Sequence, residues 1–153
     1  MTRLLARRKL LPLLLCYAQG KLPVQGRTRM QKIIFLFEQE IGKDTGLYEY
    51  QFQAANFGPF SWRLSNALDF LVSNGLVEET KKPYGDAEKY EYSLTEEGVR
   101  AVKEAIAEDG RYSKYLRKME ELKVKYNDMG LRTLLMDIYS RFPDYAAKSQ
   151  YEF

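Results

Sequence analysis

One stretch of the chain decides its fold class: residues 61–94 read SWRLSNALDFLVSNGLVEETKKPYGDAEKYEYSL. Its first part predicts a helix over 61–74, because the Ser61 hydroxyl can cap the helix start and Gly75 favours a stop. Apolar residues recur between them at helical spacing, namely Leu64, Ala67, Leu68, Leu71 and Val72. This helix therefore has one face for a core and one for solvent.

A β-hairpin follows this helix directly. Segments 76–81 and 88–94 favour strands, and the second alternates apolar and polar side chains. Between the two segments, Pro83 fixes φ and Gly85 accepts a positive φ, which together favour a turn. A capped helix followed by a hairpin predicts the recognition helix and the wing of a winged-helix domain.

Two further helices are predicted before this stretch. Residues 4–20 place leucines along one side of a helix, and a loop is expected over 21–26. Residues 29–41 repeat apolar side chains at helical spacing. Thr28 is the expected N-cap of this second helix, and Gly42 is its expected stop.

The segment 48–54 alternates aromatic or small side chains with polar ones, which is the period of a half-buried strand. Helix, helix, strand, helix and hairpin is the order of a winged helix. About twenty residues separate the second and third helices, more than the three or four of a tight helix-turn-helix.

The remainder of the chain is helical, with Thr95 as the expected N-cap of the first segment and two further segments that begin after Gly110 and Gly130. The predicted fold class is therefore α+β and mostly α: a winged helix-turn-helix with a three-helix C-terminal extension. We expect a single domain over 1–153. The winged-helix core would cover 1–94, and the helical extension would cover 95–153.

The composition excludes several kinds of active site. The 153 residues include no histidine and one cysteine, Cys16, so histidine-based catalysis, a structural zinc site and an internal disulfide lack the necessary residues. Cys16 lies in an apolar run and is expected to be a buried, inert thiol. Acidic pairs such as Glu78 and Glu79 are adjacent and point apart, and no glycine-rich phosphate loop occurs. We expect no enzyme, no cofactor and no metal, and a cytoplasmic location.

The N-terminus is basic and then apolar. Arg7, Arg8 and Lys9 precede an apolar run over 10–16, a pattern superficially similar to a signal peptide. The run is too short to span a membrane, and Pro12 interrupts it. We expect a first core helix with a basic outer face, and no membrane association.

The charge is distributed unevenly around a net value of +3. Residues 1–26 carry five basic and no acidic side chains, residues 27–94 carry eight basic and ten acidic ones, and residues 95–153 carry eleven of each. DNA affinity depends largely on the neutralisation of phosphates. The acidic balance over 27–94 is therefore an objection to DNA binding.

The outer face of the helix over 61–74 is a candidate DNA-reading surface. Ser61, Arg63 and Asn66 lie at its start, and arginine can bond guanine while asparagine can bond adenine in the major groove. Asp69 cancels the charge of Arg63, so the alternative is an ordinary solvated helix face.

Three cations at the start of the second helix are better placed for phosphates: Arg27, Arg29 and Lys32. Backbone amides and the helix dipole favour anions at that position. With the basic residues of 7–9 they could form one stripe. The alternative is that Arg27 and Arg29 pair with acidic residues inside the domain.

The wing offers Lys81, Lys82 and Lys89 to the DNA backbone. Acidic residues outnumber them and give the wing a net charge of −2. The alternative for these lysines is a mixed surface charge at a sheet edge.

Protein binding is the second functional hypothesis. Phe60, Trp62 and Tyr84 are candidate anchors, because aromatic residues are enriched at protein interfaces. The C-terminal helices could form a homodimer, as DNA-binding proteins with two half-sites do. The hypotheses are thus a transcriptional regulator that binds double-stranded DNA, and a protein-interaction module, antitoxin-like or part of an assembly, that does not.

Several motifs resemble those of known proteins. Residues 26–36 (GRTRMQKIIFL) resemble the opening motif of the YwgA-like uncharacterised prokaryotic proteins, and 57–61 (FGPFS) resemble their turn into the third helix. Residues 94–98 (LTEEG) are similar to a strand-to-helix junction common in winged helices. Residues 139–143 (YSRFP), followed by 148–149 (KS), resemble the family's C-terminal signature. The resemblance spans nearly the whole chain. It implies a winged-helix fold distantly similar to SocA-type antitoxin domains, and it assigns no activity and no binding residue.

Overall fold

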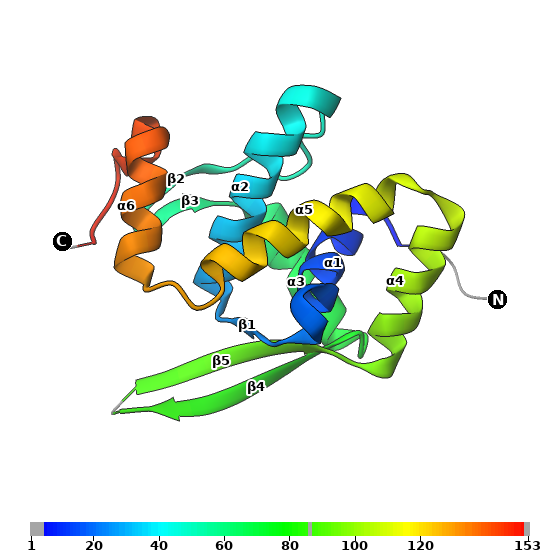
Figure 1. Cartoon of the computed structure of the whole chain (residues 1–153). Helices are drawn as coiled ribbons and strands as arrows, with labels where there is room; N and C mark the ends of the chain where they lie inside the picture. The colour runs from blue at the N-terminus through cyan, green and yellow to red at the C-terminus, as the bar shows by residue number, and fades with distance from the viewer. Residues whose placement is uncertain (1–4, 86, 152–153) are drawn as a thin grey trace.

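The computed structural model describes residues 5–85 and 87–151, apart from the side chain of Tyr84. The protein is α+β and mostly helical, as predicted, with two small antiparallel sheets (Figure 1). Its elements are α1 (Arg7–Lys21), β1 (Val24–Gln25), α2 (Arg27–Thr45), β2 (Gln53–Ala55), β3 (Gly58–Phe60), α3 (Trp62–Ser73), β4 (Val77–Tyr84), β5 (Ala87–Leu94), α4 (Glu96–Glu108), α5 (Arg111–Tyr126), α6 (Leu131–Arg141) and the 3-10 turn η1 (Pro143–Ala146).

The larger sheet has the strand order β1–β5–β4. β4 and β5 form a long hairpin that extends away from the helices (Figure 1). β1 pairs with the base of β5, where Val24 lies opposite Tyr92. The prediction of a loop over 21–26 is therefore wrong at β1. The two residues of β1 are too few to show the alternation of a strand, and β5, with which they pair, lies far along the chain.

Both strands of the long hairpin extend further than predicted. Pro83 lies within β4, opposite Glu88. β4 is an edge strand, so the N–H that proline lacks removes no ladder bond from the sheet interior. Asp86, which belongs to the predicted turn, lies outside the described residues.

The helix α1 lies at the centre of the molecule, and α5 crosses it (Figure 1). Residues 10–16 of α1 are all buried, so the expectation that only one side is buried is wrong there. Helices on several sides cover α1, including α3, α4 and α5. One cluster of buried apolar residues draws on all six α-helices, and the extension over 95–153 thus shares its core with residues 7–94.

A lysine from α5 completes the irregular end of α1. The backbone at 18–20 leaves helical geometry, and carbonyls at a helix end need other partners. The buried ammonium of Lys123 donates to the carbonyl oxygens of Cys16, Ala18 and Leu22 at 3.3, 2.7 and 2.5 Å. The first helix therefore depends on a residue more than 100 positions later.

The prediction of a strand over 48–54 is wrong for most of that segment. Tyr50 is 1% exposed and Tyr48 is 56% exposed, so the alternation does not place one face inward. The buried Glu38 carboxylate accepts hydrogen bonds from the backbone N–H groups of Glu49 and Tyr50 at 2.6 and 3.2 Å. These bonds hold the chain as a loop, and only its end pairs as β2.

Two predicted helix caps are confirmed. The Ser61 hydroxyl oxygen accepts a hydrogen bond from the backbone N–H of Leu64, and the Thr95 hydroxyl oxygen accepts one from Gly98. Both caps depend on residues three positions apart, which is why the local sequence shows them.

The predicted ends of α2 are wrong. The helix begins after Gly26 rather than at a Thr28 cap, and it continues past Gly42 to Gly46, whose φ is +69°. Gly42 lies inside the helix, where the end of the exposed Tyr48 ring packs against it, 2.5 Å from the place that a Cβ would take.

Candidate functional site

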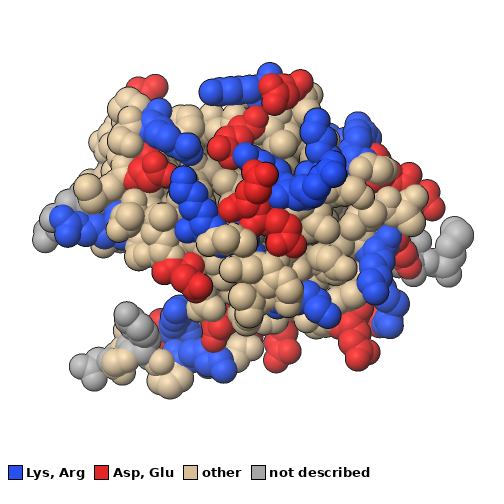
Figure 2. Space-filling view, viewed as in Figure 1, with Lys and Arg blue, Asp and Glu red and all other residues tan. Residues whose placement is uncertain are grey.

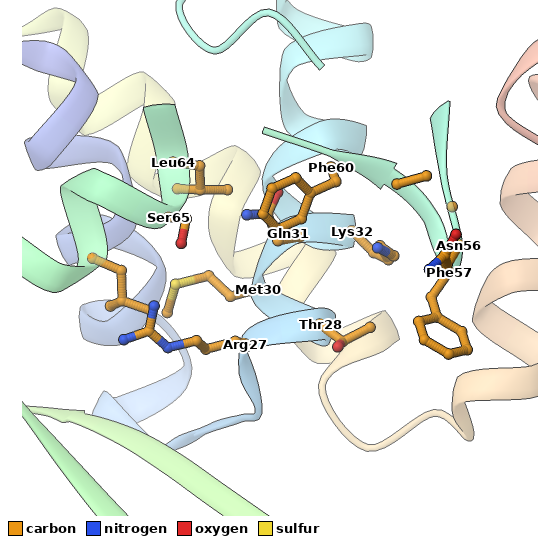
Figure 3. A pocket seen from close by; sticks show the side chains of 13 residues that line it. Arg27, Thr28, Met30, Gln31, Lys32, Asn56, Phe57, Phe60, Leu64 and Ser65 are labelled. Atoms are coloured by element: carbon orange, nitrogen blue, oxygen red, sulfur yellow. The ribbon is translucent and has the colours of Figure 1, made fainter. Parts of the chain in front are cut away.

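The helices α2 and α3 and the β2–β3 hairpin surround a cavity of about 360 Å³, which we call the α2–α3 cavity (Figure 3). This volume lies within the range of known ligand pockets. Its apolar wall includes Met30, Phe57, Phe60, Leu64 and Leu68. Its polar lining includes Arg27, Thr28, Lys32, Asn56 and Ser65.

Gln31 joins α2 to the start of α3 beside this cavity. Its buried amide donates to the Ser61 carbonyl oxygen at 3.0 Å and accepts from the Ser61 N–H at 2.9 Å. The Ser61 hydroxyl donates to the Tyr50 carbonyl oxygen. Ser61 is fully buried, so the expectation that it contacts DNA is corrected, because its polar groups are engaged inside the protein.

Gly58 brings the β2–β3 hairpin close to α6. Its φ is +87°, and a Cβ there would lie 3.0 Å from Leu135 Cδ2 and 3.4 Å from Lys32 Cε. Glycine suits this position for two reasons. It adopts a positive φ without strain, and it has no side chain that would crowd Leu135 and Lys32. The hairpin wall of the cavity is thus held between α2 and α6.

Lys32 is a buried cation in the wall of the cavity. It is 3% exposed, and its ammonium donates to the Pro59 carbonyl oxygen at 2.9 Å. Burial lowers the pKa of Lys32 to about 8. Within the described residues no carboxylate pairs with it. The expectation of a surface phosphate contact at Lys32 is corrected, since the side chain points into the protein.

Arg27 ties four elements together at the mouth of the cavity. Its guanidinium bonds to Asp69 of α3 at 2.6 Å, to Glu79 of β4 at 3.4 Å and to the Tyr92 hydroxyl of β5 at 2.9 Å. The Tyr92 hydroxyl in turn donates to Glu79 at 2.6 Å. Arg27 therefore follows the alternative in which it pairs with acids of the domain, and its charge is already balanced.

Arg29 caps the C-terminal end of α5. Its guanidinium donates to the carbonyl oxygens of Tyr126, at 2.8 Å, and Met129, and to that of Gln25 at 3.1 Å. A cation at a helix C-terminus is favoured by the helix dipole. Arg29 is thus bonded to carbonyl oxygens and not to the acidic residues that the sequence suggested. Because these bonds engage its guanidinium inside the protein, the expected phosphate contact at Arg29 is corrected.

The outer face of α3 is aromatic at its start and nearly neutral along its length. Trp62 is 65% exposed, and its ring meets the ring of Phe60 edge to face at 4.8 Å. Phe57, on the same hairpin, is 48% exposed. Arg63 and Asn66 are exposed as expected, and Arg63 donates to the Glu49 carbonyl oxygen at 3.3 Å. We call Phe57, Phe60 and Trp62 the aromatic rim.

The β4–β5 hairpin, the predicted wing, carries mixed charges. Lys81 pairs with Glu88 at 2.8 Å, and Lys82 lies opposite Lys89 in the strand register. The side chain of Tyr84, a predicted partner contact, lies outside the described residues. The face in Figure 2 shows basic and acidic side chains interspersed, without one continuous basic area.

The basic residues at the start of α1 also lie close to α3. Arg7 pairs with Glu49 at 3.6 Å, and the Lys9 ammonium lies 3.6 Å from the centre of the Phe70 ring. Lys9 and Arg27 thus contact neighbouring residues of α3, Phe70 and Asp69. The basic start of α1 and the basic start of α2 therefore both contact α3. Arg7 and Arg27 pair with acidic side chains of the protein, however, and these ion pairs reduce the positive charge that is available to a ligand.

Other chemical groups contribute little to a site. Cys16 is buried, and burial raises the pKa of its thiol to about 12, so it is held as an unreactive thiol. Over residues 5–85 and 87–151 no group of acidic or cysteine side chains is arranged to hold a metal ion. In the same part of the chain no helix has the length and apolar character to cross a bilayer.

The sequence alone did not predict the α2–α3 cavity or the hydrogen bonds between Gln31 and Ser61. One signal was present, because Gln31 and Lys32 interrupt an otherwise continuous run of buried apolar residues over 30–37. Polar side chains with buried neighbours on both sides are usually bonded inside a protein. The β2–β3 hairpin that they hold is too short to be recognised by period.

Comparison with known proteins gives one partial similarity. No family model matches the chain. Over 73 residues the chain is 32% identical to the uncharacterized protein YwgA of Bacillus subtilis (strain 168), which covers 48% of this chain and 42% of YwgA. The similarity supports the resemblance to YwgA over about half of the chain, less than the nearly complete span of the motifs. The chain matches under half of YwgA's length.

Proposed function

We propose that this protein is a winged-helix module that binds another protein through the α2–α3 cavity and the aromatic rim. The observation that carries the proposal is the exposed Trp62, which meets Phe60 edge to face beside a cavity lined by Met30, Leu64 and Leu68. Exposed aromatic side chains next to an apolar hollow are typical of interaction sites.

The arrangement of the elements supports the winged-helix part of the proposal. Apart from β2 and β3, the order α1, β1, α2, α3, β4 and β5, with β1 paired to β5, fits a winged helix in which α3 would be the third helix and β4–β5 the wing. The β2–β3 hairpin occupies the place of the usual turn between α2 and α3. An antitoxin-like role and a role in a larger assembly both fit such a module.

Electrostatics favours protein over DNA as the partner. Three cations at the start of α2 are not offered to phosphates: Arg27 is engaged by acids, Arg29 is engaged by carbonyl oxygens, and Lys32 is buried. Tight DNA binding needs several cations that can reach phosphates. An aromatic rim over an apolar cavity instead suits the core of a protein interface.

Site-specific photo-crosslinking tests the proposal. The chain carries p-benzoylphenylalanine in place of Trp62 and, as a control, in place of Met136, which is 51% exposed on α6. We expect position 62 to give a discrete crosslinked protein in cells, and position 136 not to give it. The crosslink should disappear in Phe57→Ser, an exposed position. Identical products from both positions, or a crosslink that survives Phe57→Ser, would overturn the proposal.

DNA binding is the second candidate function. It is favoured by the exposure of Arg63 and Asn66 at the start of α3, where a recognition helix reads bases. Fluorescence anisotropy with duplex fragments at low and physiological salt tests it. Asp69→Asn removes one acid from Arg27, so under this hypothesis it raises the affinity severalfold. An unchanged, weak and fragment-independent affinity would reject it.

A homodimer remains a prediction for either function. Sedimentation equilibrium of the purified chain measures the mass directly. A mass of about one chain at all concentrations would reject the dimer.

A further inference from the structure

We infer that the α2–α3 cavity takes a carboxylate from its partner, namely an aspartate or glutamate flanked by an apolar residue, and that this carboxylate pairs with the ammonium of Lys32. The inference rests on the proposed protein-binding function and specifies the chemistry of the segment that enters the cavity.

The first argument is the state of Lys32. An ammonium group has three N–H donors, and one described bond, to the Pro59 carbonyl oxygen, engages it. The side chain is 3% exposed, so water satisfies little of the remainder. A buried cation is costly unless an anion pairs with it. The lowered pKa of Lys32 has this same cause, and a carboxylate bound in the cavity would relieve it.

The second argument is the charge around the cavity. The acids nearest its mouth, Asp69 and Glu79, are already bonded to Arg27. Arg27 and Thr28, at the start of α2, line the cavity, and the amide end of the helix dipole there also favours an anion. The lining thus presents the ammonium of Lys32 together with hydroxyl and amide donors, and none of the described residues that form the wall is an acid.

The third argument is the division of the wall. Met30, Leu64 and Leu68 form an apolar part between α2 and α3, whereas Lys32 and Asn56 lie toward the hairpin (Figure 3). An apolar side chain can fill the first part while a neighbouring carboxylate reaches the second. The aromatic rim would cover the backbone of that segment, which is why we assign the carboxylate to a partner protein.

Matched peptides provide the test. The probes are the N-acetylated, C-amidated tripeptides Leu-Glu-Leu and Leu-Gln-Leu, which differ in charge and hardly in shape. They are titrated into the full chain at pH 7, while NMR follows the backbone amides of Gly58 and Phe60 and the side-chain resonances of Lys32. We expect the glutamate peptide to bind about tenfold more tightly, the effect of a charge-assisted hydrogen bond. The Lys32 resonances should shift with this peptide alone.

Two variants locate the effect. Lys32→Met keeps the length of the side chain and should abolish the preference for glutamate, whereas Lys82→Met, on the exposed wing, should preserve it. Equal binding of the two peptides, or a preference that survives Lys32→Met, overturns the inference. No binding of either peptide up to about 10 mM overturns it as well. If Lys32→Met fails to fold, the Lys32 resonances of the unmodified chain decide the question.

The inference and the proposed function fail in different ways. A crosslink at position 62 together with equal binding of the two peptides would leave a protein-binding module without a carboxylate site. Loss of the crosslink specificity together with a glutamate preference would leave an anion site that serves something other than a protein.

Discussion

At the scale of single residues, three polar side chains near the start of α2 are directed inward. Arg29, Gln31 and Lys32 each bond to the backbone of another segment: the end of α5, the start of α3 and the β2–β3 hairpin. These residues belong to the motif that resembles the YwgA-like proteins. Their chemistry explains the motif as a set of internal braces, since each one adds a hydrogen bond to the backbone of another segment.

Gln31→Ala should destabilise the fold by about 1–3 kcal/mol, because it leaves the Ser61 N–H buried without its partner, while the Ser61 carbonyl oxygen keeps only its bond from the Ser65 N–H. Urea unfolding measures the change. Gln53→Ala, at an exposed position of β2, is the control and should cost under about 0.5 kcal/mol. Equal costs for the two variants would contradict the bracing role of Gln31.

Lys32 predicts a pH dependence of stability. Its pKa is lowered from 10.5 to about 8 in the folded chain, so between these values the unfolded chain binds more protons. The free energy of unfolding therefore rises with pH across this window. Lys32→Met should remove up to about 1.4 kcal/mol per pH unit of that slope. Urea unfolding at several pH values from 7.5 to 9.5 compares this variant with Lys82→Met, which should keep the original slope.

At the scale of elements, the β2–β3 hairpin depends on its contact with α6. Gly58 and Gly85 both have positive φ, +87° and +59°, but of the two only Gly58 has described atoms within 4 Å of the place that a Cβ would take. Both alanine variants should lose stability through strain. Gly58→Ala should cost at least about 1 kcal/mol more, because it also crowds Leu135. Thermal unfolding of the pair measures the difference, and equal losses would refute the close contact.

Local signals predicted the elements that local contacts define. Ser61 and Thr95 were identified because a cap and its helix are adjacent, and the apolar period of α3 marks its buried face. The loop before β2 was not predictable, since Glu38 of α2 holds it by bonds to the backbone of Glu49 and Tyr50. The cavity was not predictable either. Three elements form it, and the burial of Lys32 depends on all of them.

At the scale of the whole molecule, residues 7–94 and the helical extension over 95–151 share one core. Tyr112, Met119 and Tyr126 of α5 belong to the same buried cluster as the leucines of α1. The lysine that completes α1 is also in α5. The division at residue 94 therefore describes the order of the elements and not two cores.

A chain that ends at residue 94 should not fold cooperatively, because α1 would lose the helix that covers it and the apolar surface of residues 10–16 would meet water. Circular dichroism during heating, compared with the complete chain, tests this expectation. A sharp thermal transition in the shortened chain would show that residues 1–94 have a sufficient core of their own.

The dependence of α1 on Lys123 also has a consequence for biosynthesis. The carbonyl oxygens of Cys16 and Ala18 are separated from their lysine partner by 107 and 105 positions. At the usual rate of translation, about 5–20 s pass between the synthesis of the two segments. The leucine-rich helix therefore emerges from the ribosome well before α5 can cover it, and we expect the apolar segment over 10–16 to stay incompletely covered in the nascent chain during that interval.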